Sequence, residues 1–166
     1  MSGGVVKDKE ISLEPLPVLK ERVSPCRAQC PLENGIPRWM EKVKNADWEG
    51  AWQIIKGYNP FPAITGHVCY HFCQDKCNRE QWDEAIAIGE IEKAIGLWRL
   101  ENYRTGSHRE PKPGHKKIAV VGSGPAGLSC AYYLNAMGAG VTVFEKLPLA
   151  GGLLATGIPE YRFPRH

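Results

Sequence analysis

Five of the six cysteines lie in two short segments of the N-terminal half. Cys69, Cys73 and Cys77 recur at intervals of four in "CYHFCQDKC", and Cys26 and Cys30 share that interval in "CRAQCP". Thiolates are good metal ligands, and on a helical turn this interval would put the sulfur atoms on one side. The polar residues between the last three cysteines disfavour a core helix. The spacing therefore predicts a metal site.

Three kinds of site compete for these cysteines. Disulfides are disfavoured because we expect the chain to be cytoplasmic, where thiols stay reduced. Structural zinc is a second candidate, with His67 and His71 nearby, although the repeated C-x3-C spacing is not typical of zinc knuckles. An iron–sulfur cluster suits a set of thiolates, and the Cys30-Pro31 step is a frequent neighbour of such clusters. We favour the cluster and keep zinc as an alternative.

A glycine pattern in the C-terminal part predicts a dinucleotide site. Gly122, Gly124 and Gly127 form G-x-G-x-x-G between a predicted strand, "KIAVVG", and a predicted helix, "PAGLSCAYYLNAMG". The first glycine permits a tight turn, the second lets the backbone approach a pyrophosphate, and the third lets helix and strand pack closely. Glu145 ends the next strand and would accept hydrogen bonds from ribose hydroxyls, which favours FAD or NAD over NADP. Cys130, inside the helix, is expected to be a small buried hydrophobe.

The elements that position these residues divide the chain into four parts. We expect an extended leader, a helical cysteine-rich domain, a linker, and the start of an α/β domain, over residues 1–25, 26–104, 105–116 and 117–166. Within the helical domain, helices are expected from Ile36, after an Asp47 N-cap, and over residues 81–103, with 59–66 as a loop. A strand, a helix and a second strand joined by short turns predict a parallel βαβ unit.

Bulk composition excludes some classes of function. The 166 residues are 43% hydrophobic and carry a formal charge of +3 with mixed signs, which suits a folded protein and indicates no particular partner. There is no basic, aromatic-rich run of the kind that binds nucleic acid. No apolar stretch reaches the roughly 18 residues that span a bilayer, and the N-terminus lacks a signal-peptide core. We expect no nucleic-acid or membrane partner.

In combination these motifs resemble one family. "CPLENGIP", "NPFPAITGHVC", C-x3-C-x3-C, "AIGEIEKAI", "VVGSGPAGLSCA" and "GGLLATGIPEYRFP" occur in the same order in the glutamate synthase small (β) subunit and the N-terminal portion of dihydropyrimidine dehydrogenase. The resemblance covers about residues 24–165. It implies a mainly α iron–sulfur domain with [4Fe–4S] clusters, followed by a Rossmann-type FAD-binding domain and an NADPH domain. Electrons pass from NADPH to FAD and through the clusters to a partner.

The resemblance also implies site residues. Cys30, Cys69, Cys73 and Glu92 would hold one cluster, and Cys26 and Cys77 would be what is left of a second. The family has two further cysteines upstream of Cys26, which are absent here, so we expect one cluster. Its fourth ligand is Glu92, or Cys26 or Cys77 in its place; alternatively, a partner chain completes the second cluster. The expected cofactor-binding residues are Gly122, Ser123, Gly124, Pro125, Ala126, Gly127, Glu145, Lys146, Gly151, Gly152 and Leu153.

These observations predict an electron-transfer flavoprotein subunit or fragment that passes electrons between NAD(P)H, FAD and a [4Fe–4S] cluster to a larger oxidoreductase subunit. No catalytic residue is expected. One βαβ unit cannot close a Rossmann sheet, so we expect a shortened product or half of a split subunit, with NAD(P)H binding on a domain absent from this chain. A second hypothesis is a non-catalytic iron–sulfur adaptor that completes a larger complex. A third is a zinc-binding structural module.

Overall fold

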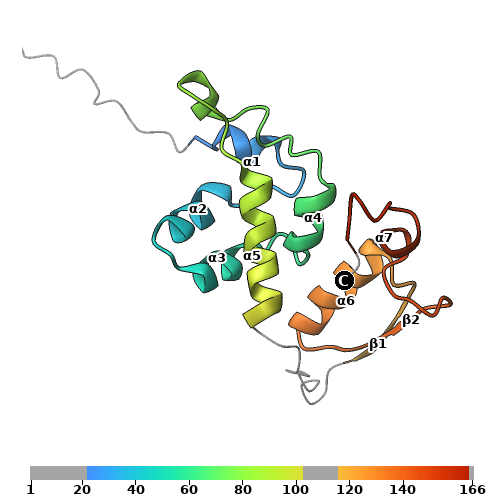
Figure 1. Cartoon of the computed structure of the whole chain (residues 1–166). Coiled ribbons are helices and arrows are strands. Elements are labelled where there is room, and N and C mark those ends of the chain that lie inside the picture. The colour runs from blue at the N-terminus through green and yellow to red at the C-terminus, as the bar shows by residue number, and fades with distance from the viewer. Residues whose placement is uncertain (1–21, 103–115, 165–166) are drawn as a thin grey trace, which may run out of the picture.

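The computed structural model describes residues 22–102 and 116–164, which form a helical part and a βαβ part (Figure 1). Most of the expected leader and linker therefore lies outside the described residues. The elements are α1 (Pro25–Gln29), α2 (Ile36–Lys44), α3 (Trp48–Ile55), α4 (Pro62–Val68), the 3₁₀ helix η1 (Asn78–Gln81), α5 (Ile88–Asn102), β1 (Lys117–Val121), α6 (Pro125–Ala136), β2 (Gly140–Phe144) and α7 (Leu153–Thr156). None of the described helices is long and apolar enough to cross a membrane.

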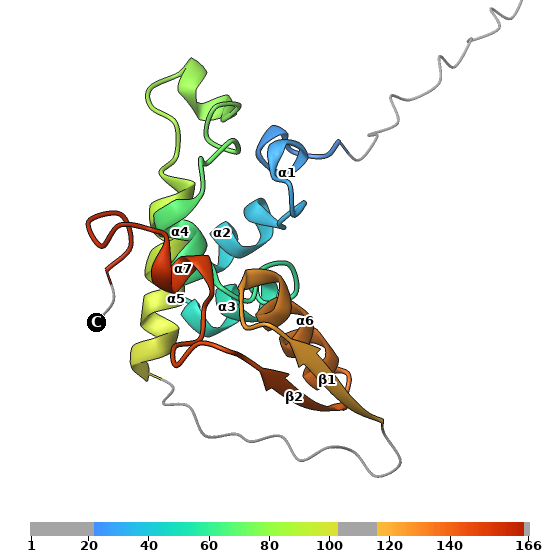
Figure 2. The same cartoon turned by 90° about the vertical axis from the view of Figure 1, so that its right-hand side faces the viewer.

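Helix α5 is the centre of the helical part. In Figure 1 it runs between α2 and α3 on one side and α4 on the other, and Figure 2 shows α4 beside it from a second direction. The buried core between these helices contains one cysteine among apolar side chains: Ile36, Trp39, Ala51, Ile55, Cys73, Ile88 and Ile95. One of the predicted metal ligands, Cys73, is therefore part of the core.

Helices α2 and α3 begin where local signals predict. Pro37 occupies the first turn of α2, where its missing N–H costs nothing. Asp47 caps α3, and its Oδ1 accepts a hydrogen bond from the backbone N–H of Gly50 at 2.8 Å. The carboxylate also pairs with Lys42 at 3.0 Å. Both predictions of a helix start are confirmed.

Helix α4 corrects the expectation of a loop over residues 59–66. The chain becomes helical at Pro62, and α4 packs directly on the backbone of α5. A Cβ on Gly66 would lie 2.4 Å from Cβ of Lys93, and a Cβ on Gly96 would lie 2.3 Å from the backbone nitrogen of Ala63. Two prolines and a glycine suggested a loop, but one proline starts the helix and the glycine provides its contact surface.

Two further expectations in this part are wrong. The expected helix over 81–103 begins only at Ile88, and Trp82 before it is 90% exposed. The segment 69–77 is not helical, and its turn contains His71 at φ 57°, outside right-handed helical geometry. On α5 itself, Ile88 and Ile95 are buried, and Leu97 is 40% exposed.

The predicted parallel βαβ unit is confirmed. Strands β1 and β2 pair from Lys117–Gly140 to Val121–Phe144, and α6 packs on them, between the sheet and the helical part in Figures 1 and 2. A Cβ on Gly127 would lie 2.0 Å from the carbonyl oxygen of Gly122, so only glycine permits this approach of helix to strand.

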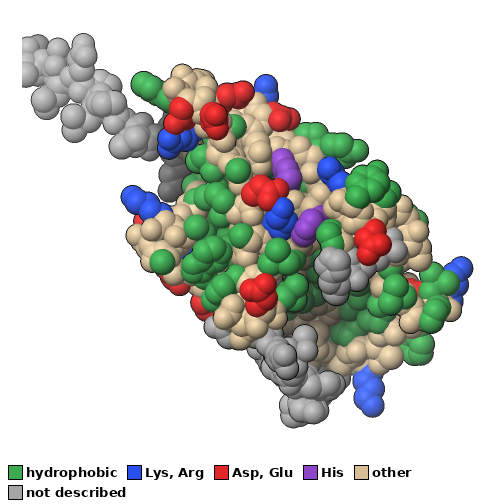
Figure 3. Space-filling model, viewed as in Figure 1, with side chains coloured by type: hydrophobic (Ala, Val, Ile, Leu, Met, Phe, Trp, Pro, Cys, Tyr) green, Lys and Arg blue, Asp and Glu red, His purple; other side chains and the backbone are tan. Residues whose placement is uncertain are grey.

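The surface of the βαβ part differs from expectation in one residue. Cys130 is exposed rather than buried, as is Ala126 one helical turn before it. Val121 and Phe144 are 87% and 57% exposed at the ends of the two strands. Figure 3 shows hydrophobic side chains at the surface of this part. The two described strands thus leave apolar sheet surface uncovered.

The α4–α5 contact predicts an effect of mutation on stability. Gly96→Ala should destabilise the helical part by about 1–3 kcal/mol, because the new methyl group would meet backbone atoms of α4 and force the helices apart. Gly57→Ala is the matched control, since a Cβ there would contact only the Ile54 carbonyl oxygen at 3.4 Å. Urea unfolding followed by circular dichroism measures both, and equal effects of the two substitutions would contradict the packing role.

Candidate cluster and nucleotide sites

Three cysteines are positioned by helix ends and by the core. Cys69 follows the last residue of α4, and its Sγ accepts a hydrogen bond from the backbone N–H of His71 at 3.3 Å. Cys73 lies in the turn after it and is buried in the core. Cys30, much earlier in the sequence, follows α1 and packs against the same core. Segments about forty residues apart therefore bring these thiols to one region.

The pKa of Cys73 reports which groups surround it. Burial is the largest cause that raises this pKa to about 12, and the neighbouring Cys30, Glu92 and Cys69 contribute to the same rise by disfavouring another negative charge. These three groups are the ones that the resemblance implies as ligands together with Cys73. A thiolate at this position is unfavourable unless a cation compensates its charge.

Glu92 is a carboxylate that α5 holds inside the helical part. Its Oε1 accepts a hydrogen bond from Nδ2 of Asn59 at 2.6 Å and lies 3.2 Å from Oγ1 of Thr65. Burial raises the pKa of Glu92, and these two hydrogen bonds lower it in part. The carboxylate is thus not the solvated surface group that its helix position alone would suggest.

The donor set fits an iron–sulfur cluster. Three thiols and a carboxyl group share a region in which negative charge is disfavoured, and bound iron would supply the compensating positive charge. Within residues 22–102 and 116–164, no three His, Cys, Asp or Glu side chains lie close enough together to hold one metal ion. A cluster binds each ligand through a different iron, so its ligands need not converge on one point.

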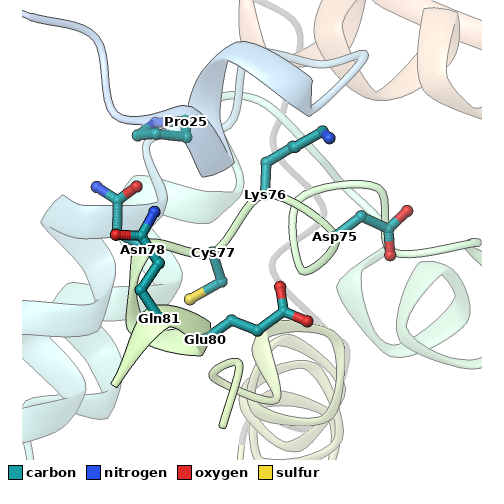
Figure 4. A pocket seen from close by; sticks show the side chains of 7 residues that line it. All are labelled: Pro25, Asp75, Lys76, Cys77, Asn78, Glu80 and Gln81. Carbon is teal, nitrogen blue, oxygen red and sulfur yellow. The ribbon is translucent and has the colours of Figure 1, made fainter. Parts of the chain in front are cut away.

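Cys26 and Cys77 differ in their surroundings, and Cys26 packs against the same core as Cys30. Cys77 lines an open cavity of about 400 Å³ together with Pro25, Asp75, Lys76, Asn78, Glu80 and Gln81. Figure 4 shows the side chain of Asp75 pointing away from Cys77. The Cys26 thiol is 3.3 Å from Oγ of Ser24.

The rings of the two histidines near the cysteines, His67 and His71, contact residues other than the cysteine thiols. The Nδ1 atom of His67 lies 2.7 Å from the carbonyl oxygen of Ala63, and its ring packs edge-on against Phe163 with centroids 5.7 Å apart. The ring of His71 packs against Gly89, where an added Cβ would lie 2.1 Å from Nε2. Among the described residues, that Nε2 is a buried polar atom without a hydrogen-bond partner.

In the βαβ part, Ser123 and Glu145 join the glycine loop to the end of β2. Oε2 of Glu145 accepts hydrogen bonds from the backbone N–H of Ser123 at 2.8 Å and from its hydroxyl at 2.5 Å, and Oε1 accepts from Leu147 N–H at 2.9 Å. The Ser123 hydroxyl makes the largest contribution to lowering the pKa of Glu145 to about 2, followed by the backbone N–H of Leu147 and that of Ser123. Glu145 is therefore ionised at neutral pH and fixed in place.

The Gly151–Gly152 turn closes on the same loop. The backbone N–H of Gly151 donates to the carbonyl oxygen of Ser123 at 3.0 Å and approaches its hydroxyl at 3.2 Å. A Cβ on Gly152 would lie 3.0 Å from Cα of Gly124. The close approach expected of this turn is therefore made to the glycine loop itself.

A cavity of about 410 Å³ lies beside these contacts, and six of its lining residues come from the strand ends and the acid-bearing segment. They are Val121, Gly122, Phe144, Glu145, Lys146 and Leu147; Gly152, Leu153 and Thr156 complete the wall. Gly122, at φ 95°, makes the tight turn expected of the first glycine. Gly124 precedes α6, whose first residues are Pro125 and Ala126. A dinucleotide phosphate would face the N-terminus of α6.

Asn59 and Thr65 are site residues that sequence reasoning missed. Asn59 is only 2% exposed, and its side chain contacts both Thr65 and Glu92. The available signal was chemical: two polar side chains in an otherwise apolar and proline-rich segment. A buried amide must have hydrogen-bond partners, so its position should have raised the question of which group it serves.

Comparisons with known proteins place both parts of the chain. A family model described as dihydropyrimidine dehydrogenase domain II, 4Fe-4S cluster, matches residues 9–103. A model of an NAD(P)-binding Rossmann-like domain matches residues 120–164. The two matches meet the chain on either side of the segment between α5 and β1, which agrees with the division between the helical and βαβ parts.

Curated relatives are similar to this chain over most of its length. The NADPH-Fe(3+) oxidoreductase subunit beta of Geobacter sulfurreducens is 38% identical over 146 residues, which cover 86% of this chain and 22% of the relative. The NADP(+)-dependent formate dehydrogenase subunit beta of Moorella thermoacetica is 35% identical over 163 residues, with 86% and 23% covered. The NADPH glutamate synthase small chain of Bacillus subtilis is 40% identical over 136 residues, with 82% and 28% covered. The chain thus spans about a quarter of the length of these relatives.

Ser123→Ala tests the hydrogen bonds around Glu145. The substitution removes the hydroxyl but keeps the backbone N–H, so the pKa of Glu145 should rise from about 2 toward its ordinary value of 4.5. Carboxyl carbon chemical shifts measured by NMR during a pH titration report this change. Ser129→Ala, a serine substitution within α6, is the control and should leave the Glu145 titration unchanged. An unaltered titration in Ser123→Ala would contradict the assigned contacts.

Proposed function

The chain belongs to the dihydropyrimidine dehydrogenase domain II, 4Fe-4S cluster family, and on this basis we propose that it passes electrons between a flavin dinucleotide and one [4Fe–4S] cluster within an NAD(P)H-dependent oxidoreductase. The observation that carries the proposal is Cys73, a thiol buried in the core against which Cys30 packs, with Cys69 at the end of α4 before the same turn. With Glu92, these are the residues that the family resemblance implies as the ligands of one cluster. The second family match supports a dinucleotide-binding part next to it.

Each proposed cluster ligand has a role that follows from its position. Cys69 directly follows α4 and Cys73 lies in the turn after it, and Cys30 would close the ligand set from the end of α1. Glu92 would be the oxygen ligand from α5. When bound, the cluster takes up and releases one electron at a time. The surrounding core would exclude water and so help to set the reduction potential.

The proposed cofactor of the βαβ part is FAD. Gly122 and Gly124 would let the backbone approach the pyrophosphate, and Glu145 would accept from the ribose through Oε1, which carries only one of its three hydrogen bonds. Its fixed negative charge would repel a 2′-phosphate, which favours FAD over NADP at this site. Lys146 and Leu153 line the same cavity and would contact the nucleotide.

The two proposed redox sites lie on segments that pack together. Ile64 of α4 lines a cavity of about 420 Å³ with Leu128 of α6 and residues of the segment after β2, which include Leu149, Gly151 and Phe163. The edge-on contact of His67 with Phe163 joins the same two segments. Because α4 leads directly to Cys69, this packing supports a short route for electrons between the nucleotide part and the cluster part.

The reaction of the whole protein is proposed from its relatives. Their names include NADPH with Fe(3+), NADP(+) with formate, and NADPH with glutamate synthase. We propose that electrons enter from NAD(P)H and leave to a larger oxidoreductase subunit. The exposed Val121 and Phe144 favour a second candidate, a non-catalytic adaptor whose sheet is completed by another chain. NAD(P)H oxidation by this chain alone would exclude the adaptor.

Anaerobic reconstitution tests the cluster. The chain should take up about four iron atoms with an equal amount of acid-labile sulfide. Cys73→Ser should lose most of this iron because it removes the central thiolate ligand, whereas Cys130→Ser should retain all of it because Cys130 is exposed on α6. Metal analysis of the three proteins gives the result. Stoichiometric zinc without sulfide would instead support the structural zinc alternative.

Substitutions of two glycines distinguish an effect on FAD binding from an effect on folding stability. A Cβ on Gly124 would meet no atom within 4 Å, so Gly124→Ala should leave the thermal unfolding midpoint unchanged and weaken FAD binding by at least about tenfold by intruding on the pyrophosphate. Gly127→Ala should instead lower the unfolding midpoint, because its methyl group would meet the carbonyl oxygen of Gly122. Fluorescence titration with FAD and thermal unfolding measure the two effects. Unchanged FAD affinity in Gly124→Ala would contradict the assignment.

A further inference from the structure

Asn59 has a buried side chain whose amide nitrogen and oxygen both make hydrogen bonds. It lies between α3 and α4 and is 2% exposed. Its Nδ2 donates to Glu92 Oε1 at 2.6 Å and to Thr65 Oγ1 at 2.7 Å, and its Oδ1 accepts from the backbone N–H of Phe61 at 3.0 Å. The contact with Phe61 fixes which end of the amide faces Glu92, because only the opposite end can donate.

Thr65 provides a second contact to the same carboxylate oxygen. Its Oγ1 lies 3.2 Å from Oε1 of Glu92, 3.2 Å from the carbonyl oxygen of Phe61 and 3.3 Å from that of Pro62. The hydroxyl has one proton for these three acceptors, while it accepts the Asn59 hydrogen bond through a lone pair. The hydrogen bonds that described residues give to Glu92 therefore converge on Oε1.

We infer that Asn59 and Thr65 are positioning residues that hold Glu92 by Oε1 and thereby direct its other oxygen to the iron of the cluster. This inference rests on the proposed function. Groups that hydrogen-bond a metal ligand fix its orientation and tune the metal that it binds. A free glutamate side chain has several rotatable bonds, and its entropy would oppose a single ligating geometry. Here two residues of one segment remove that freedom before any metal arrives.

The same contacts set the electron density of the ligand. Donors on Oε1 withdraw charge from the carboxylate and make it a weaker ligand to oxidised iron, which raises the reduction potential of the cluster. Removing a donor should therefore shift the midpoint potential in the negative direction. A purely structural role of Asn59 and Thr65 would change the unfolding midpoint and leave this potential unchanged.

The test is a redox titration, followed by EPR, of the anaerobically reconstituted chain. Thr65→Val removes the hydroxyl at nearly constant volume and charge and should shift the midpoint potential negative, and Thr65→Ser should restore the unaltered value. In a Glu92→Cys background, Thr65→Val should cause no shift, because the oxygen on which it acts is gone. An unshifted potential in Thr65→Val, or an equal shift in the Glu92→Cys background, would overturn the inference.

A second pair of variants covers the case in which Thr65→Val does not fold. Asn59→Asp replaces the donor with an acceptor beside Glu92 and should shift the potential negative. Gln53→Glu makes the same chemical change at a matched but exposed contact, in which Gln53 donates to Glu49 at 2.5 Å, and should leave the potential unchanged. Equal potentials in Asn59→Asp and the unaltered chain contradict only the inference. An unaltered chain that takes up no iron contradicts the proposed function as well.

Discussion

The close contact between α4 and α5 is the constraint on which the rest of the helical part depends. Gly66 and Gly96 remove the side chains that would hold the two helices apart, so backbone lies against backbone. Because Cys69 directly follows α4 and Glu92 lies on α5, this contact brings a thiol-bearing turn and a carboxylate to the same region. Thr65, on α4, reaches Glu92 only at such a short separation. The proposed ligand set is thus a consequence of helix packing.

The pKa values of two glutamates, Glu92 and Glu145, are shifted in opposite directions by their surroundings. Burial raises the pKa of Glu92, whereas the Ser123 hydroxyl and backbone N–H groups lower the pKa of Glu145 to about 2. Glu145 is ionised without a cation and suits a role in recognising neutral ribose hydroxyls. Glu92 and Cys73 lie where charge is unfavourable until a positive ion arrives, which is the situation expected of ligands to a metal centre.

Sequence reasoning succeeded where the determining interaction is local. The Asp47 cap, Pro37 in the first turn of α2, and the strand–glycine–helix order around Gly122 depend on residues within a few positions of each other. It failed where the interaction joins distant segments. The helix at 62–68 is stabilised by packing on α5, and no periodicity in so short a segment reveals this.

The predicted ligand set stays a prediction, and the structure shows where its members lie. Cysteine spacing and family resemblance gave candidate ligands, and Cys30, Cys73 and Glu92 do share a region. The intervals of four would put the sulfur atoms on one side of a helical turn, whereas the segment 69–77 is not helical and His71 has a left-handed backbone. Asn59 was missed because its partner, Glu92, lies 33 residues away in the sequence. Cys130 was wrongly expected to be buried because its exposure depends on which face of α6 packs.

The central claim is that three thiolates and one carboxylate hold a single cluster. Mössbauer spectroscopy of the chain reconstituted with iron-57 tests it most directly, because each iron site contributes its own signal. The account predicts one [4Fe–4S] cluster per chain in which one iron differs from the other three through its oxygen ligand, and in which Glu92→Cys removes that difference. Four equivalent thiolate-bound irons in the unaltered chain, or iron that is not in a cluster, would contradict it.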